Sequence, residues 1–277
     1  LVVGLLALLP RAWRAVRGFP VALTWRYAGI GAIVALHWLA FYGSIKLANA
    51  SVATICLALA PVTIVLLEPL LHGAPLRRRE LALGLVVIPG IAMIVGGIPS
   101  AMTAGFWMGE ASALVAAAYT GLNKRWIGDR DALGVTAVEL AGGLLVVLVL
   151  LPLLPDAAPR AGDAAWADVL GVLAIPSARD FGLLFLLASA CTLLPFALSL
   201  AALRHVSAFT LQLSVNLEPI YAIALAAAFL GEARELGALF YVGAALVIAA
   251  VLAHGLSVAG YSSLRRSMPG GPSPDPP

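Results

Sequence analysis

The chain has 277 residues, of which 62% are hydrophobic and 11% are charged, and its formal net charge is +3. A soluble domain typically has about 45–50% apolar and about 25% charged residues. The composition therefore excludes a water-soluble enzyme, a disordered chain, a disulfide-stapled secreted domain and a nucleic-acid-binding protein. It predicts a polytopic membrane protein.

Apolar runs separated by charged or Gly/Pro clusters predict the helices in chain order. The first run, Leu1 to Leu9, is shorter than the roughly 20 residues that a span needs, so we interpret it as the end of a helix that begins before this sequence. Complete spans are predicted at approximately 26–48, 51–72, 80–98, 106–127, 133–154, 180–203, 207–230 and 235–259. Within the long connection 155–179, Trp166 to Ile175 is too short to span and is expected at the membrane interface.

The distribution of lysine and arginine predicts how these spans are oriented. Alternate ends of the spans carry 13 and 4 of these residues, which together account for all 17. Because cytoplasmic ends are enriched in positive charge, this bias predicts a cytoplasmic C-terminus and places the 155–179 connection outside.

The sequence contains no motif that indicates an enzyme, a cofactor or a metal site. Cys56 and Cys191 lie in separate apolar runs and are predicted to be small core residues, not a disulfide or a metal pair. Zinc-ligand spacing, a glycine-rich phosphate loop, HExxH and GxSxG do not occur. We therefore expect neither catalysis nor a bound cofactor or metal ion.

Two blocks of the sequence are related to each other. LALAPVTIVLLEPLLHG around Pro61 matches SVNLEPIYAIALAAAFLG around Pro219 at a shift of 158, which also places Lys46 on Arg204. Further on, Gly84 and Gly90 match Gly237 and Gly243 at a shift of 153. Five spans per repeat would invert one copy relative to the other, and inverted repeats are typical of transporters with a substrate site near the midplane.

The segments HWLAFYGSIKLANASVATICLALAPVTIVLLEPLL and ALRHVSAFTLQLSVNLEPIYAIALAAAFLGE make the chain resemble an EamA-type member of the drug/metabolite transporter superfamily. The resemblance implies an all-α membrane fold of ten helices in an inverted repeat of five-helix units, with the first helix and part of the second missing here. It divides the chain into a first repeat over 1–98, a second over 106–259 and a disordered tail over 260–277. The HW and SVNLEP elements are most similar to exporters of aromatic and other neutral amino acids.

The first candidate binding residues lie in span 26–48. His37, Phe41 and Ser44 share one helical face, with Trp38 and Tyr42 beside it. Such a face could form a cavity wall in which rings pack against an apolar substrate and His37 binds its polar end. The alternative is a histidine that only bonds a neighbouring backbone carbonyl.

Polar residues inside other spans complete the candidate site, because polar groups in a bilayer are costly and need a partner. Span 207–230 carries Gln212, Asn216 and Glu218, the last directly before Pro219, and interhelical polar packing is the alternative role. Glu110 and Tyr119 are candidates on span 106–127, where small residues every four positions predict close helix packing. Snorkelling is the competing account of Glu110 and of Glu139, and Glu68 is expected to be structural.

These observations predict a carrier that exports small neutral or zwitterionic metabolites, amino acids in particular, by alternating access. Pro61 and Pro219 are the expected bending points of two gating helices, and the Ala/Arg/Gly richness suggests a bacterial inner membrane. The partners expected are a small-molecule substrate and the lipid bilayer, not nucleic acid. Nucleotide-sugar or organic-phosphate carriers and a non-transporting scaffold are the alternatives, although phosphate would favour basic residues inside the membrane, and the central portions of the spans have none.

Overall fold

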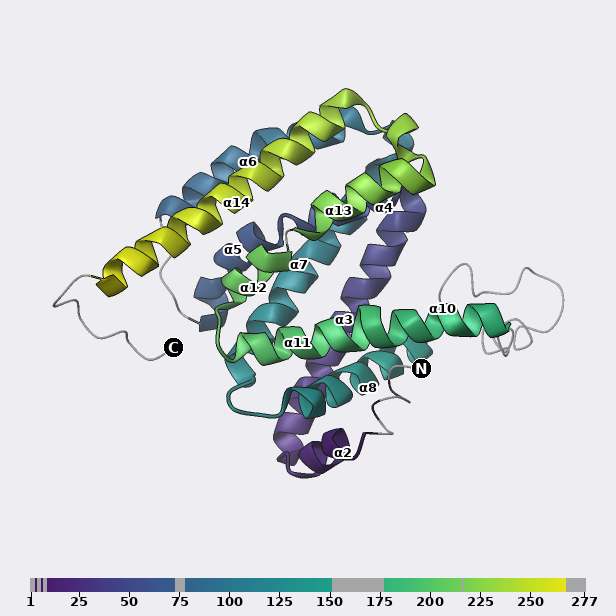
Figure 1. Ribbon diagram of the computed structural model, residues 1–277, viewed down its shortest axis with the longest axis vertical. Helices are drawn as coiled ribbons and strands as arrows, with labels where there is room; N and C mark the ends of the chain where they lie inside the picture. Colours follow the sequence, from purple (N-terminus) through teal and green to yellow (C-terminus); the bar gives the residue numbers. More distant parts are fainter. Residues whose placement is uncertain are drawn as a thin grey trace. The chain divides into compact units, whose positions relative to one another are not determined.

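The computed structural model describes Val3, Leu6 and the segments 9–72, 78–150, 177–215 and 217–267. These segments consist of helices joined by short connections, and no strand occurs within them (Figure 1). The helices are α2 (Pro10–Arg17), α3 (Val21–Leu47), α4 (Ala50–Leu57), α5 (Ala60–His72), α6 (Arg78–Gly97), α7 (Thr103–Trp126), α8 (Ala132–Leu150), α10 (Ala178–Ala188), α11 (Leu194–Leu203), α12 (Ala208–Val215), α13 (Glu218–Leu225) and α14 (Ala238–Ser267). The predicted all-α fold is confirmed.

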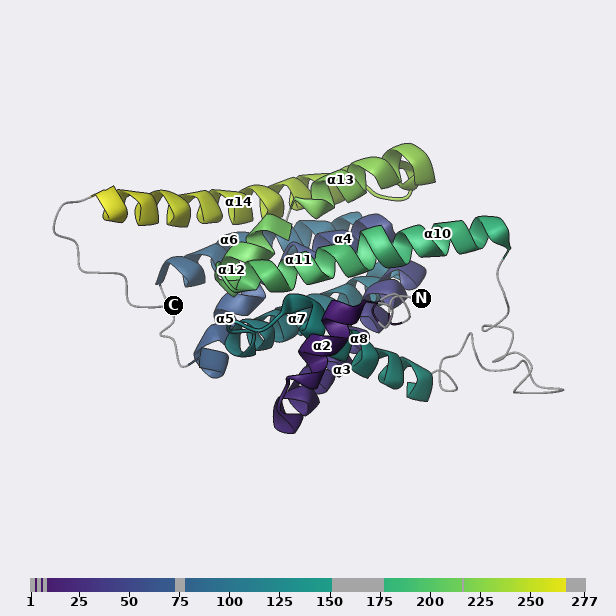
Figure 2. The ribbon, with the colours of Figure 1, turned by 60° about the horizontal axis from the view of Figure 1, so that its bottom comes forward.

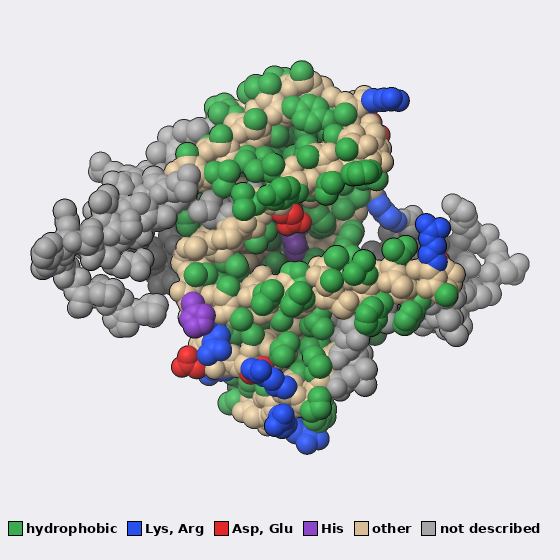
Figure 3. Space-filling model, in the orientation of Figure 1, with side chains coloured by type: hydrophobic (Ala, Val, Ile, Leu, Met, Phe, Trp, Pro, Cys, Tyr) green, Lys and Arg blue, Asp and Glu red, His purple; other side chains and the backbone are tan. Residues whose placement is uncertain are grey.

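Several of the predicted spans are continuous apolar helices. By length and composition α3, α8 and the run Ala178–Leu203 could each cross a membrane, and Val87–Gly97 with Ser100–Trp126 forms a further pair bent by 120°. Figure 3 shows hydrophobic side chains over much of the surface in that view, as expected for a protein surrounded by lipid.

Two predicted spans, 51–72 and 207–230, are instead broken in the middle. The first divides into α4 and α5, and the second into α12 and α13, each close to the proline that was predicted to be a bending point. The two breaks are equivalent, because a shift of 158 carries the bounds of α4 onto those of α12 and the start of α5 onto the start of α13. Pro219 lies in the first turn of α13, where its missing N–H costs no helical hydrogen bond, and Pro61 takes the matching position in α5.

Side-chain caps explain where several helices begin. The Asn49 side chain accepts from the Val52 N–H at the start of α4, and Ser177 accepts from Asp180 N–H at the start of α10. At the start of α8, an Asp131 oxygen accepts from the N–H groups of Leu133 and Gly134, at 3.0 and 3.2 Å. These bonds satisfy N–H groups that have no partner inside the helix.

The chain divides into two compact units, and each contains segments of both sequence repeats. The first unit comprises residues 1–39 and 118–208, and the second comprises 40–117 and 209–277. Helices α3 and α7 contribute residues to both units.

The first unit is organised around α8, which packs against α2 and α11. It also packs closely against α3, where a Cβ on Gly31 would collide with the backbone oxygen of Glu139. Two hydrogen bonds to backbone carbonyls hold α7 in this unit: Tyr27 Oη donates to Trp126 O at 2.8 Å, and Lys124 Nζ donates to Leu203 O at 2.9 Å.

The second unit contains the long antiparallel pair α6 and α14, which lie side by side in Figures 1 and 2. The repeat-matched glycines Gly90 and Gly243 face each other here, since a Cβ on either would lie within 3.2 Å of the other's backbone oxygen. A reciprocal contact between matched residues is what a local twofold axis produces. Buried side chains of α4, α6, α7 and α14, including Ile55, Phe106 and Phe240, form the core of this unit.

Three further predictions have different outcomes. Helix α14 continues to Ser267, so the predicted disorder is wrong for 260–267. Cys56 is buried as predicted, but Cys191 is exposed and is not a core residue. The proposed interfacial segment Trp166 to Ile175 and the tail beyond Ser267 lie outside the described residues.

Candidate functional site

His37 lies in an aromatic cluster of the first unit. Its side chain is buried, and its ring centroid is 5.5 Å from that of Tyr119 on α7. The Tyr119 and Trp38 rings each lie 6.5 Å from Phe196 on α11, so three helices supply the cluster. The structure thus brings together three predicted binding residues, and it adds Phe196, which sequence reasoning missed because nothing in its own apolar run distinguishes it.

The remainder of the predicted aromatic face belongs to the second unit. The rings of Phe41 and Tyr42 are 5.7 Å apart, and Tyr42 is 55% exposed. Ser44 is fully buried, and its hydroxyl donates to the Gly105 carbonyl at 2.7 Å. Ser44 therefore joins α3 to α7, which is a packing role and not that of a cavity wall.

Glu110 is half-buried on α7 in the second unit, and its Oε1 atom is buried without a hydrogen-bond partner. The preceding Gly109 allows close packing, since a Cβ there would lie 2.7 Å from Cys56 Sγ and 2.9 Å from Ser44 Oγ. The small residues of α7 thus bring three helices together, which confirms the packing role predicted for them.

The predicted residues of the second repeat lie around the helix break between α12 and α13. Gln212 is buried on α12, whereas Glu218 begins α13 and its side chain is exposed. Pro219 is buried. Asn216 lies outside the described residues, and for Pro61 the structure describes only the backbone, in α5.

Glu139 is a buried residue that the sequence analysis did not include among the candidate binding residues. Its side chain is fully buried, so the snorkelling account is wrong for this residue. Asn123 Nδ2 on α7 donates to its Oε2 atom at 3.2 Å. The sequence signal was available: an asparagine and a glutamate occur on consecutive helices near a shared connection.

A second missed residue, Glu232, binds the start of α4. Gly231, with a φ of 74°, ends the preceding helical turn in a left-handed conformation that glycine favours. The buried Glu232 carboxylate then accepts from the N–H groups of Ala50 and Ser51, at 3.0 and 2.9 Å. A carboxylate at a helix N-terminus also interacts favourably with the helix dipole.

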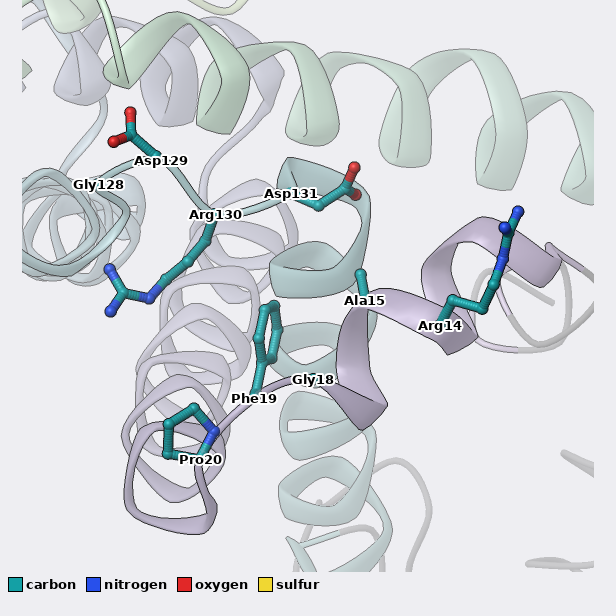
Figure 4. Close-up of a pocket in the computed structure, with 9 residues that line it drawn as sticks. All are labelled: Arg14, Ala15, Gly18, Phe19, Pro20, Gly128, Asp129, Arg130 and Asp131. Carbon is teal, nitrogen blue, oxygen red and sulfur yellow. The ribbon is translucent and has the colours of Figure 1, made fainter.

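An open pocket of about 640 Å³ lies in the first unit, between the end of α2 with its connection to α3 and the connection before α8 (Figure 4). Its charged lining residues are Arg14, Asp129, Arg130 and Asp131, with Phe19 between them. It contains none of the predicted binding residues. Among the described residues, no group of His, Cys, Asp and Glu side chains could hold a metal ion.

Comparison with known families identifies the chain. The model of the EamA-like transporter family matches residues 1–96 and 103–255. The chain belongs to this family. It is therefore an integral membrane protein and a transporter of small molecules, as the EamA-type resemblance predicted.

Two other comparisons complete this result. No curated protein matched the chain. A solved crystal structure of another protein is similar to this chain, with a TM-score of 0.54 and 19% sequence identity. The similarity covers 97% of this chain and 85% of the other one. At this identity the likeness supports the fold alone.

Proposed function

We propose that this EamA-like transporter exports small neutral or zwitterionic metabolites, amino acids with aromatic or apolar side chains in particular. The observation that carries the proposal is the His37 cluster, in which the buried imidazole lies against the Tyr119 ring, and the rings of Tyr119 and Trp38 each lie near Phe196. Aromatic rings offer an apolar substrate side chain offset or edge-to-face contacts, and an imidazole can donate to or accept from its polar end.

The positions of the basic residues favour such a cargo over a phosphorylated one. Lysine and arginine do not occur in the central parts of the predicted spans. Near the ends, Lys124 donates to the Leu203 carbonyl, and Arg204 lies 3.9 Å from Asp129. A nucleotide-sugar or organic-phosphate carrier would need guanidinium or ammonium groups directed at its substrate.

The paired helix breaks support an alternating-access mechanism. Interrupted helices near the midplane are typical of inverted-repeat transporters, and both breaks here directly precede a matched proline. We therefore assign bending to Pro61 and Pro219. From the distribution of lysine and arginine and from the composition, we further propose that the protein lies in a bacterial inner membrane with its C-terminus on the cytoplasmic side. The proposed polar contacts of the substrate lie around the second break and are Gln212, Asn216 and Glu218, of which Glu218 is suited to an amino group. Further proposed contacts in the same unit are Phe41, Tyr42 and Glu110.

A flux panel tests the proposal directly. The full chain is reconstituted in liposomes, and uptake of phenylalanine, leucine and a nucleotide sugar is compared. We expect uptake of the amino acids. His37→Ala should weaken apparent substrate affinity by about 2- to 10-fold, the equivalent of one aromatic contact of about 0.5–1.5 kcal/mol.

The matched control is His205→Ala, which removes an exposed histidine outside the aromatic cluster and should leave flux unchanged. Uptake of the nucleotide sugar alone would contradict the proposed cargo. Wild-type flux in the His37 variant would remove this residue from the binding site.

A further inference from the structure

Glu139 is a buried carboxyl group that the proposed substrate contacts do not use. Its backbone lies in the contact between α8 and α3, where glycines allow the two helices to touch, and its carboxyl group meets Asn123 on α7. Besides the contact at Gly31, a Cβ on Gly142 would lie 2.5 Å from the Ala28 carbonyl oxygen. Glu139 is thus fully buried where α8 packs closely, with its carboxyl group against Asn123.

The polar surroundings of Glu139 fit a neutral acid better than a carboxylate. Its Oε2 atom accepts one hydrogen bond from Asn123, while Glu139 Oε1, Asn123 Oδ1 and Thr136 Oγ1 are buried without partners. A carboxylate would place a full charge in this interior against a single neutral donor, which is costly. A proton on Oε1 creates a donor, and the Asn123 oxygen is an unused acceptor in the same pair.

Several charged and titratable groups on the elements packed around α8 have contacts of their own, and Tyr27 also interacts electrostatically with Arg130 and with Glu139. Their contacts are Arg11 with Asp131, Arg204 with Asp129, Lys124 with the Leu203 carbonyl, Tyr27 with the Trp126 carbonyl and His37 with the Tyr119 ring. Within the described part of this unit, the Glu139 carboxyl group accepts its hydrogen bond from the neutral amide of Asn123 and not from a cation.

We propose that Glu139 and Asn123 form a proton-binding site that couples transport to a pH gradient. One proton adds to Oε1 of Glu139, no other bond forms or breaks, and the new O–H donates to Asn123 Oδ1. The resulting acid–amide pair favours the packed arrangement of α7 and α8, which carry Asn123 and Glu139. Release of the proton leaves a charge that favours separation of these helices. This inference rests on the proposed carrier function, which it deepens by naming the coupling ion.

Infrared spectroscopy tests proton binding without any substrate. The full chain in lipid should show the carbonyl band of a protonated carboxylic acid at neutral pH. This band should lose intensity in Glu139→Gln, in which an amide of similar shape replaces the acid, and it should shift in Asn123→Ala, where the acceptor is lost. Asp180→Asn, which removes an exposed carboxyl group of the same unit, should leave the band unchanged. A band that is identical in the wild type and Glu139→Gln would overturn the proposal.

Transport of labelled phenylalanine then separates coupling from a structural role. Wild-type liposomes should accumulate phenylalanine in response to a pH gradient, and they should also exchange it against internal unlabelled phenylalanine without a gradient. Glu139→Gln should keep the exchange and lose the response to the gradient. A variant that keeps the full response contradicts the proposal, because an acid with only a structural role would leave coupling unchanged.

The two measurements also distinguish this proposal from the carrier function on which it rests. A wild-type chain that moves none of the panel substrates contradicts the proposed cargo, while the infrared band still decides whether Glu139 holds a proton. A wild-type chain that transports phenylalanine without any response to pH keeps the carrier function and overturns the coupling site. If Glu139→Gln does not fold, the shift of the band in Asn123→Ala decides the assignment.

Discussion

Glycine at position 31 is the residue on which the packing of the first unit depends. It lies in the middle of α3, where glycine is an unfavourable choice for a helix by about 1 kcal/mol relative to alanine. The reason is steric, because α8 passes so close that any side chain would meet the Glu139 backbone. The glycine lowers the intrinsic stability of the helix but allows α3 and α8 to cross closely, and small residues are commonly found at such crossings in membrane proteins.

This reasoning predicts opposite effects for two neighbouring glycines of α3. Gly31→Ala should destabilise the protein by about 1–3 kcal/mol, the usual cost of overpacking a closely packed contact. Gly29→Ala should be neutral or stabilising, since a Cβ there meets nothing within 4 Å and alanine favours the helix. Thermal unfolding of both variants in detergent provides the measurement, and equal melting temperatures would show that α3 and α8 do not cross at Gly31.

Residue identity alone predicted some side-chain environments and not others. The helical period placed His37 on an inward face, and the structure buries it against Tyr119. Ser44 lies on the same face, yet its hydroxyl binds the Gly105 carbonyl. Periodicity shows which way a side chain points but not which helix it meets, and for that reason the contacts of Phe196 could not be predicted.

At the scale of the helix, the start of α4 depends on a residue far away in the sequence. Helix α4 has only 8 residues, and short helices derive little stability from their own hydrogen bonds. Three N–H groups of its first turn are satisfied, one by Asn49 and two by Glu232. The Glu232 carboxylate thus joins the first repeat to the second within one unit.

We expect Glu232→Ala to destabilise the second unit by about 1–3 kcal/mol, because two buried N–H groups lose their acceptor. Hydrogen exchange in residues 50–57 should become faster, since α4 would fray from its first turn. The matched control is Glu235→Ala, which removes an exposed carboxylate that accepts one bond, from Asn49. Equal effects of the two variants on α4 would contradict the capping role.

The helix breaks show how far the sequence specifies an element. A proline in an apolar run predicts an interruption nearby, and Pro61 and Pro219 occupy matched positions of the repeat. The structure places each break before the proline, so that the proline becomes part of a first helical turn. Such a proline can kink one helix or separate two, and the outcome depends on how the flanking segments pack. Here α4 packs against α13, a contact that the sequence alone does not show.

At the scale of the whole chain, the repeats and the compact units divide the sequence differently. The family model matches two consecutive parts, whereas each unit combines segments from both of them. A single-chain pattern finds the repeats, because matched prolines and glycines recur at a fixed shift. The units depend instead on long-range contacts such as α6 with α14, where the matched Gly90 and Gly243 meet. The sequence predicted these glycines as packing positions, but not that they would pack against each other.

The predicted inverted arrangement of the repeats leads to a topological test. An odd number of spans in each repeat places matched ends on opposite sides of the bilayer, and the lysine and arginine distribution of 13 against 4 agrees with this alternation. In a variant without Cys56 and Cys191, single cysteines at Arg78 and Arg130 should react with a membrane-impermeant maleimide from the cytoplasmic side only. Cysteines at Arg160 and Arg234 should react only from the opposite side. Labelling of positions 78 and 160 from the same side would show that the repeats are not inverted, and the two-sided symmetry that alternating access requires would be lost with it.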